Sequence, residues 1–172
     1  MPNTKAVGVA FSDPELTSGT TITGATIDST TKVLSNIPSG QTASQQGATI
    51  ATTGNSDVFI IAPAAGTLTS AVFSGVDALA ASNTDYVTFS ITNLGTSGSG
   101  TAAMLAATDA NTTKSTGGTA LTANAARTLT LNGTAANLVV AAGDRLRIRA
   151  AATGTLANSV TFPVYRLNFS VA

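Results

Sequence analysis

The segment DYVTFSITNL, residues 85–94, decides the fold class, because its polar and apolar side chains alternate with a period of two. Polar residues stand at the even positions from Tyr86 to Thr92, and Val87, Phe89 and Ile91 stand between them. Successive side chains of a β-strand point to opposite faces of a sheet, so this pattern is typical of a half-buried strand. We therefore predict a strand here, with Phe89 and Ile91 directed into a core between two sheets.

The same signals recur on both sides of this strand. Segments rich in Val, Ile, Thr and Phe are separated by turn sequences such as PAAG (63–66), NG (132–133) and AAGD (141–144). β-branched and aromatic residues favour a pleated sheet, and turn signals every 8–12 residues favour antiparallel strands. The expected strands lie at 57–61, 67–75, 85–94, 127–133, 137–143, 144–150 and 158–172, and residues 101–107 form a short helix or strand. The chain is therefore predicted to be all-β, an antiparallel, jelly-roll-like β-sandwich of seven or eight strands.

Apolar anchors are sparse in the first third of the 172-residue chain. Residues 1–55 contain ten Leu, Ile, Val or Phe residues, whereas residues 56–172 contain 29. A polar, glycine-rich segment cannot bury enough surface to offset the roughly 1–2 kcal/mol per residue that backbone ordering costs. We therefore expect an extended N-terminal arm over residues 1–55, ordered only against a partner, and a β-sandwich domain over residues 56–172.

Residues 108–126, TDANTTKSTGGTALTANAA, carry no clear period. A structureless stretch of this length is uncommon inside a compact domain, so it is either a functional surface loop or contains a short strand within residues 118–123. The polar, glycine-containing run over residues 113–118 favours the loop. Its exposed tip would include Lys114 as a candidate contact to other chains.

The composition excludes most catalytic chemistry. The chain contains no His, Cys or Trp, which removes Ser/His and Cys/His nucleophiles, zinc sites built from His or Cys, and disulfides. Its acidic residues stand mostly beside turns, where loop geometry alone favours Asp, and the segment 77–85 lacks the ligand spacing of an EF-hand calcium loop. We expect no enzyme activity, no metal or other cofactor, and no small-molecule substrate.

Charge and hydropathy limit the partners. Only 9% of the residues are charged, and the eight basic and eight acidic residues cancel, so no long-range field would recruit nucleic acid or an anionic membrane. The N-terminus has only a short, weakly apolar run at residues 6–11, below the about 7–15 residues of a secretory signal. No run approaches the roughly 18 apolar residues that span a bilayer. We expect no nucleic-acid partner, no signal peptide and no membrane segment.

The run DRLRIR, residues 144–149, concentrates three of the eight basic residues at alternating positions. On a strand, Arg145, Arg147 and Arg149 would project to one face about 6.6–6.8 Å apart, while Leu146 and Ile148 would enter the core. One interpretation is a solvated face whose aliphatic stems cover apolar neighbours. The other is a polar stripe that docks on an acidic or carbonyl-rich partner through planar, bidentate arginine contacts.

Two stretches of the sequence, together with the polar N-terminal arm, resemble a known class of protein. FIIAPAAGTLTSAVFSGV (59–76) and LVVAAGDRLRIRA (138–150) resemble segments of tailed-bacteriophage virion proteins, and among these the capsid decoration, or cement, proteins. The resemblance implies a β-sandwich head that forms a homotrimer on the outer capsid surface, with extended termini across the joints between major capsid proteins. It implies a virion protein made in the host cytoplasm, and no catalytic residue.

The same stretches also fit a tail- or head-fibre-type receptor module or a carbohydrate-binding β-sandwich module. A sugar-binding module is expected to expose an aromatic platform, whereas both Tyr residues and every Phe except Phe11 lie in expected strands. The resemblance to decoration proteins therefore implies a structural protein that stabilises a capsid by bridging major capsid proteins. The receptor or carbohydrate-binding module stays the alternative.

Overall fold

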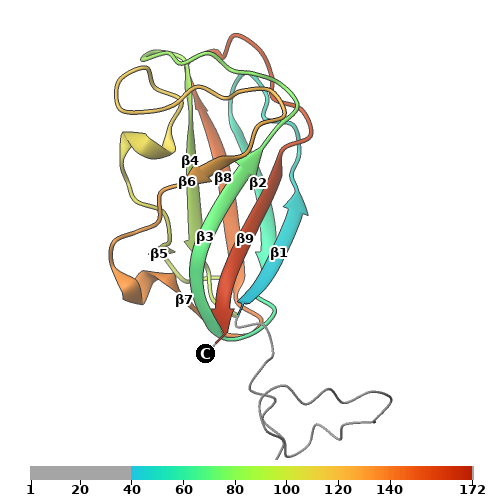
Figure 1. Ribbon diagram of the computed structural model, residues 1–172, viewed down its shortest axis with the longest axis vertical. Coiled ribbons are helices and arrows are strands. Elements are labelled where there is room, and N and C mark those ends of the chain that lie inside the picture. Colours follow the sequence, from blue (N-terminus) through green and yellow to red (C-terminus); the bar gives the residue numbers. More distant parts are fainter. Residues whose placement is uncertain (1–39, 172) are drawn as a thin grey trace, which may run out of the picture. The chain divides into compact units, whose positions relative to one another are not determined.

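The computed structural model describes residues 40–171, which form two antiparallel β-sheets packed face to face (Figure 1). One sheet has the strand order β1-β9-β3-β6, with β7 beside β3, and the other has the order β2-β8-β4-β5. Two short 3₁₀ helices, η1 (Asp109–Asn111) and η2 (Ala135–Leu138), lie in the connections. The strands are β1 (Gly40–Gln46), β2 (Asn55–Ile61), β3 (Gly66–Ser74), β4 (Tyr86–Asn93), β5 (Ala102–Ala103), β6 (Arg127–Leu129), β7 (Val139–Val140), β8 (Arg145–Thr153) and β9 (Val164–Val171).

The strand pairing is that of a jelly roll. The pairs β4–β5, β3–β6, β2–β8 and β1–β9 are nested along the chain and all antiparallel, as in a long hairpin rolled into two sheets. This confirms the predicted all-β, antiparallel sandwich. Nine strands are present in the described range rather than seven or eight, because β1 lies in the segment that was predicted to be an arm.

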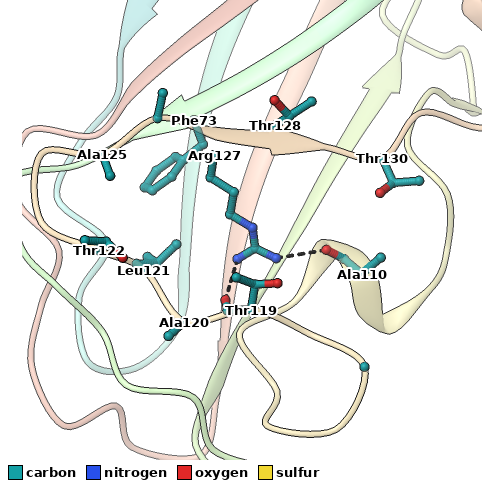
Figure 2. A pocket seen from close by; sticks show the side chains of 12 residues that line it. Phe73, Ala110, Thr119, Ala120, Leu121, Thr122, Ala125, Arg127, Thr128 and Thr130 are labelled. Carbon is teal, nitrogen blue, oxygen red and sulfur yellow. Dashed lines mark hydrogen bonds between the residues drawn. The ribbon is translucent and has the colours of Figure 1, made fainter.

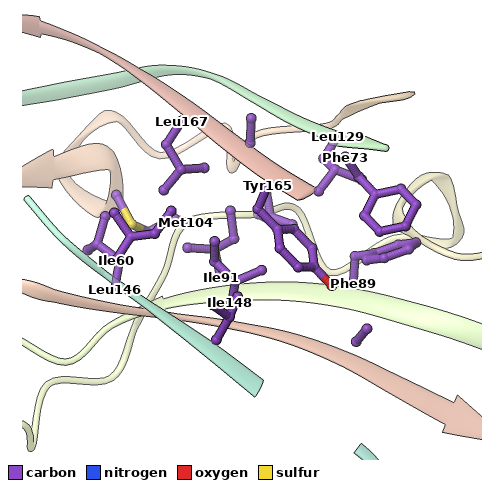
Figure 3. Packing of buried hydrophobic residues seen from close by; sticks show 14 of the residues in the cluster. Ile60, Phe73, Phe89, Ile91, Met104, Leu129, Leu146, Ile148, Tyr165 and Leu167 are labelled. Atoms are coloured by element: carbon purple, nitrogen blue, oxygen red, sulfur yellow. The ribbon is translucent and has the colours of Figure 1, made fainter. Parts of the chain in front are cut away.

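The structure confirms which side chains of β4 were predicted to point inward and which outward. Val87, Phe89 and Ile91 are buried, whereas the residues between them are only partly buried and face outward. Between the sheets, Phe73 packs against Phe89 with ring centroids 4.7 Å apart and against Tyr165 at 5.4 Å (Figure 3). Aromatic pairs at these separations add stability beyond the apolar area that they bury.

The Tyr165 hydroxyl is a polar group without a partner inside this core. The side chain is 2% exposed, and its oxygen has no hydrogen bond within the described residues. Burial raises the pKa of Tyr165, and the nearby Asp57 carboxylate adds to the rise. A buried hydroxyl that has given up its bonds to water without replacing them opposes folding.

We therefore expect the Tyr165→Phe substitution to leave the free energy of unfolding unchanged or to raise it by up to about 1 kcal/mol, because the ring is kept and only the desolvation cost is removed. Urea unfolding at neutral pH measures the change. Tyr165→Leu, which also removes the ring, should be clearly destabilising in the same assay. A loss of more than about 1 kcal/mol for Tyr165→Phe would show that the hydroxyl is hydrogen-bonded in solution.

The predicted boundary between arm and sandwich, at residues 55 and 56, is wrong for residues 40–55. All seven residues of β1 pair with β9, and Ile50 is 1% exposed and pairs with Val160. β1 reads GQTASQQ and has almost no apolar side chains, so it contributes main-chain hydrogen bonds rather than core. Such a strand gives no hydrophobic signal. The rest of the predicted arm, residues 1–39, lies outside the described residues.

Candidate docking face

The outward side chains of β8 form the centre of the candidate site. Leu146 and Ile148 are fully buried, so Arg145, Arg147 and Arg149 project from the opposite side of the sheet, as the alternation predicted. We call the outer surface of the β2-β8-β4-β5 sheet the arginine face. Neighbouring strands place residues from distant parts of the chain beside each arginine, and these neighbours differ along the row.

Arg149 is paired. Its Nε and Nη2 atoms donate to the two oxygens of Asp57, both at 2.7 Å, from directly opposite positions on β8 and β2. The hydrogen bonds from Arg149 hold the pKa of Asp57 below its usual range, and Asp57 raises the pKa of Arg149. Both side chains are about one-third exposed, so this bidentate pair positions the strands more than it stabilises the fold.

Arg147 has no acidic neighbour of this kind. Phe59 stands opposite it on β2 and Thr92 on β4. The Arg147 Nε atom is buried without a hydrogen-bond partner, and no carboxylate within residues 40–171 forms an ion pair with its guanidinium. Asp57 attracts this charge through space, but Arg149 binds both of its oxygens, so the Arg147 guanidinium can still bind a group from outside the described chain.

Arg145 bonds to a main-chain oxygen instead of to an acid. Its Nη2 donates to the Thr96 carbonyl at 2.9 Å, and Ile61 stands opposite it on β2. Within residues 40–171, no ion pair joins Arg145 to the adjacent Asp144. Asp144 is buried and accepts hydrogen bonds from the Asn93 amide at 2.9 Å and the Ala141 N–H at 2.8 Å, so it caps the turn before β8.

The edge of the arginine face is apolar. Phe59 and Ile61 are 52% and 54% exposed, because the odd-numbered residues of β2 point outward. The sequence prediction did not single out these two residues, since DVFII reads as a continuous apolar run. A signal was present, because the charge of Asp57 marks the odd positions of this strand as the outward ones.

Lys114 borders the same face but is not at an exposed loop tip. Its Nζ donates to the Asp109 carboxylate at 2.8 Å, which raises the pKa of Lys114, and lies 4.9 Å from the centre of the Tyr86 ring. The preceding Thr113 is fully buried and exchanges hydrogen bonds with Val87 through its main chain and hydroxyl. The predicted exposed run over 113–118 is therefore wrong at its start, where these hydrogen bonds attach the loop to β4.

A groove of about 350 Å³ lies between β4 and the segment 103–112, next to Lys114. Its floor includes the outward side chains of β4, a row of hydroxyl groups from Tyr86, Thr88, Ser90 and Thr92. Ser90 stands opposite Arg149, and Thr92 opposite Arg147. The arginine face therefore continues across the sheet into this groove.

The loop 108–126 is organised by Arg127, which the sequence prediction did not identify. Its guanidinium donates to the carbonyls of Thr119 at 2.9 Å, Ala110 at 2.9 Å and Thr112 at 2.7 Å, in a pocket of about 430 Å³ (Figure 2). Burial lowers the pKa of Arg127, and the charge also lies 5.4 Å from the Phe89 ring. Apart from a bridge between Leu121 and Leu79, residues 118–123 are not a strand, so this segment is a loop, and its functional role stays a prediction.

The acidic side chains of the β3–β4 connection hold loops in place. Asp77 accepts hydrogen bonds from the N–H and hydroxyl of Thr161, and Asp85 accepts from Thr84 and from the N–H of Thr155. These bonds lower the pKa of both carboxyl groups. Asn83 is bound to Thr116. Loop geometry accounts for the acidic residues of this segment.

The part of the chain that the structure describes, residues 40–171, contains no helix with the length and apolarity needed to cross a membrane. Comparison of the sequence with protein-family models finds no matching family. Searches of curated proteins and of solved structures likewise find no match to this chain.

Proposed function

We propose that this protein is a structural virion protein, which binds the outside of a phage capsid and stabilises it by bridging major capsid proteins. The observation that supports the proposal is the concentration of charge on the arginine face. Eight basic residues occur in the chain, and Lys5 and Lys32 precede residue 40, which leaves six in the described range. Four of these six, the three arginines of β8 and Lys114, lie on or beside this one face.

The arrangement suits docking better than catalysis. Arginine offers planar, bidentate contacts to carboxylates and carbonyls, and the adjacent apolar edge can exclude water from them. A shell presents its binding positions in a fixed symmetric array, so a homotrimer would engage several of them at once. Weak contacts at each position then suffice, because the second and third binding events are intramolecular.

Residues 1–39 supply the bridging element in this proposal. They are predicted from sequence to order only against a partner, and a segment of this length can span the joint between neighbouring shell subunits. Removal of these residues should leave the sandwich folded and greatly weaken retention on the shell. The proposed location is the outer capsid surface, with synthesis in the host cytoplasm.

Cosedimentation of the full chain with purified tailed-phage capsids, together with native mass spectrometry, tests the function. We expect a trimer that is retained on a shell and raises the temperature at which that shell opens. Bovine serum albumin at the same concentration is the control for trapping in the pellet. A strict monomer that none of the capsids retains would overturn the proposal.

A carbohydrate-binding or receptor module is the second candidate, and two observations favour it. The groove beside β4 has a row of hydroxyl groups along its β4 side, and Phe59 and Phe162 are exposed aromatic rings. The prediction that every Phe after Phe11 lies in a strand is wrong for Phe162, and Phe59 lies in β2 but points outward. Phe162 is 61% exposed and has a positive φ of 47°, a strained conformation for a bulky residue. Binding to a glycan array without retention on capsids would establish this alternative.

A further inference from the structure

Within the described residues 40–171, β2 has a free edge whose main-chain groups point away from the sheet. It is the last strand in the order β2-β8-β4-β5, and no main-chain hydrogen bond within residues 40–171 joins it to β1. The Ala62 N–H donates to the Asp144 carbonyl at 2.9 Å, and the Ala152 N–H donates to the Gly54 carbonyl at 2.8 Å. In an antiparallel ladder hydrogen-bonded pairs alternate, so the even-numbered residues of β2 bond to β8. The N–H and C=O groups of Phe59 and Ile61 therefore face outward.

This edge lacks the devices that usually protect edge strands. Proteins block such edges with charges, prolines or bulges, because an open edge pairs with any extended chain. β1, one edge of the other sheet, has Ala43 as its only apolar side chain. In contrast, β2 ends in the apolar run VFII (58–61), and its one charge, Asp57, is bound by Arg149. An exposed apolar edge of this kind indicates an occupant.

The charges beside the edge indicate the chemistry of that occupant. Along the β2–β8 register, Arg149 faces Asp57, but Arg147 faces Phe59 and Arg145 faces Ile61. One cation of the row therefore has a carboxylate opposite, and two have apolar residues there. A strand added beyond β2 would lie about 9.6 Å from β8, two strand spacings, which the combined side chains of arginine and glutamate can span across Phe59.

We infer that the free edge of β2 binds an extended segment of a partner protein as an added strand, with carboxylate side chains of that segment pairing with Arg147 and Arg145. Main-chain hydrogen bonds to Phe59 and Ile61 would give the affinity, and the acidic residues at alternate positions would give the specificity. The identification of the partner as a shell protein rests on the proposed function. The binding mode itself does not.

A synthetic peptide of sequence TVEVEVT, with blocked ends, tests the inference on the full chain, and the peptide TVQVQVT is its uncharged match. In ¹⁵N-resolved NMR at millimolar peptide, we expect the amide signals of Phe59 and Ile61 to shift and their hydrogen exchange to slow. Arg147→Gln should weaken binding of the glutamate peptide at least about tenfold and leave the glutamine peptide unaffected, because only the former makes a charge-assisted contact.

Ile61→Pro tests the strand pairing separately from the charge. It removes an N–H that points to the free edge and none that bonds to β8, so the sheet should persist while both peptides lose binding. Ile61→Val keeps that N–H and should keep binding. Circular dichroism and the unfolding midpoint of each variant verify that it is folded.

The outcomes separate the binding mode from the proposed function. Shifts that fall elsewhere, or equal weakening of both peptides by Arg147→Gln, would overturn the inference. So would protection of the Phe59 and Ile61 amides in concentrated protein without peptide, since a second copy would then occupy the edge. Peptide binding at β2 without retention on any capsid would contradict the proposed function and leave the inference intact. Retention on a capsid with the Phe59 and Ile61 amides still exchanging freely would overturn the inference and leave the proposed function intact.

Discussion

Phe89→Ala is expected to lower the free energy of unfolding by about 3–5 kcal/mol, the usual cost of removing a buried phenylalanine ring. Phe89 is 2% exposed at the centre of β4, with the Phe73 ring 4.7 Å away and the Arg127 guanidinium 5.4 Å from its own ring. The substitution would leave a cavity between the sheets and remove the aromatic surface beneath the half-buried guanidinium of Arg127. Domains are stable by about 5–15 kcal/mol in total, so this loss could consume most of the stability.

Chemical denaturation followed by circular dichroism measures the effect, and Thr88→Ala is the matched control on the same strand. The Thr88 side chain faces the groove instead of the core, so its loss should change the free energy of unfolding by no more than about 0.5 kcal/mol. Equal effects of the two substitutions would mean that the register of β4 is shifted by one residue, which would exchange its two faces.

Asn111→Ala should destabilise the protein by about 3 kcal/mol, although it removes only a small polar side chain. The Asn111 amide donates to the carbonyls of Ala106 and Thr130, both at 2.8 Å, and its oxygen accepts from the Thr130 N–H at 2.8 Å. The residue is 1% exposed, and its three bonds tie η1 to the segments on either side. The Ala106 carbonyl and the Thr130 N–H lose their partner, whereas the Thr130 carbonyl still accepts from the Ala106 N–H at 3.0 Å. Each group left without a partner costs about 1–3 kcal/mol, and entry of water offsets part of the sum.

Thr108→Ala serves as the control for this prediction. Thr108 occupies the N-cap position of η1 but makes no capping hydrogen bond through its side chain, so its substitution should be close to neutral. Denaturant unfolding of both variants gives the comparison. If Asn111→Ala were as mild as Thr108→Ala, the loop 108–126 would not be anchored through this amide. Hydrogen exchange at the Thr130 amide reports on the same bond independently.

Sequence alone determined the features that depend on local alternation. The outward and inward faces of β4 and β8 follow from it, including the burial of Phe89 and Leu146 and the projection of Arg147. The antiparallel all-β class follows from the spacing of the turns. Side-chain direction in a strand is set by the backbone of that strand, so no knowledge of its neighbours is needed.

Only the tertiary structure decided which residues lie next to one another. Asp57 and Arg149 are 92 residues apart, and no local pattern distinguishes Arg149, which gains a carboxylate, from Arg147, which faces Phe59. The sandwich also recruits β1, whose polar sequence suggested an arm, because β9 provides main-chain partners along its whole length. Main-chain hydrogen bonding between strands depends little on which side chains they carry. The neighbour of each strand is set by the order in which the strands of the jelly roll pair. The faces of the strands could therefore be predicted from the sequence, whereas the partners across them were fixed by the way the chain closes on itself.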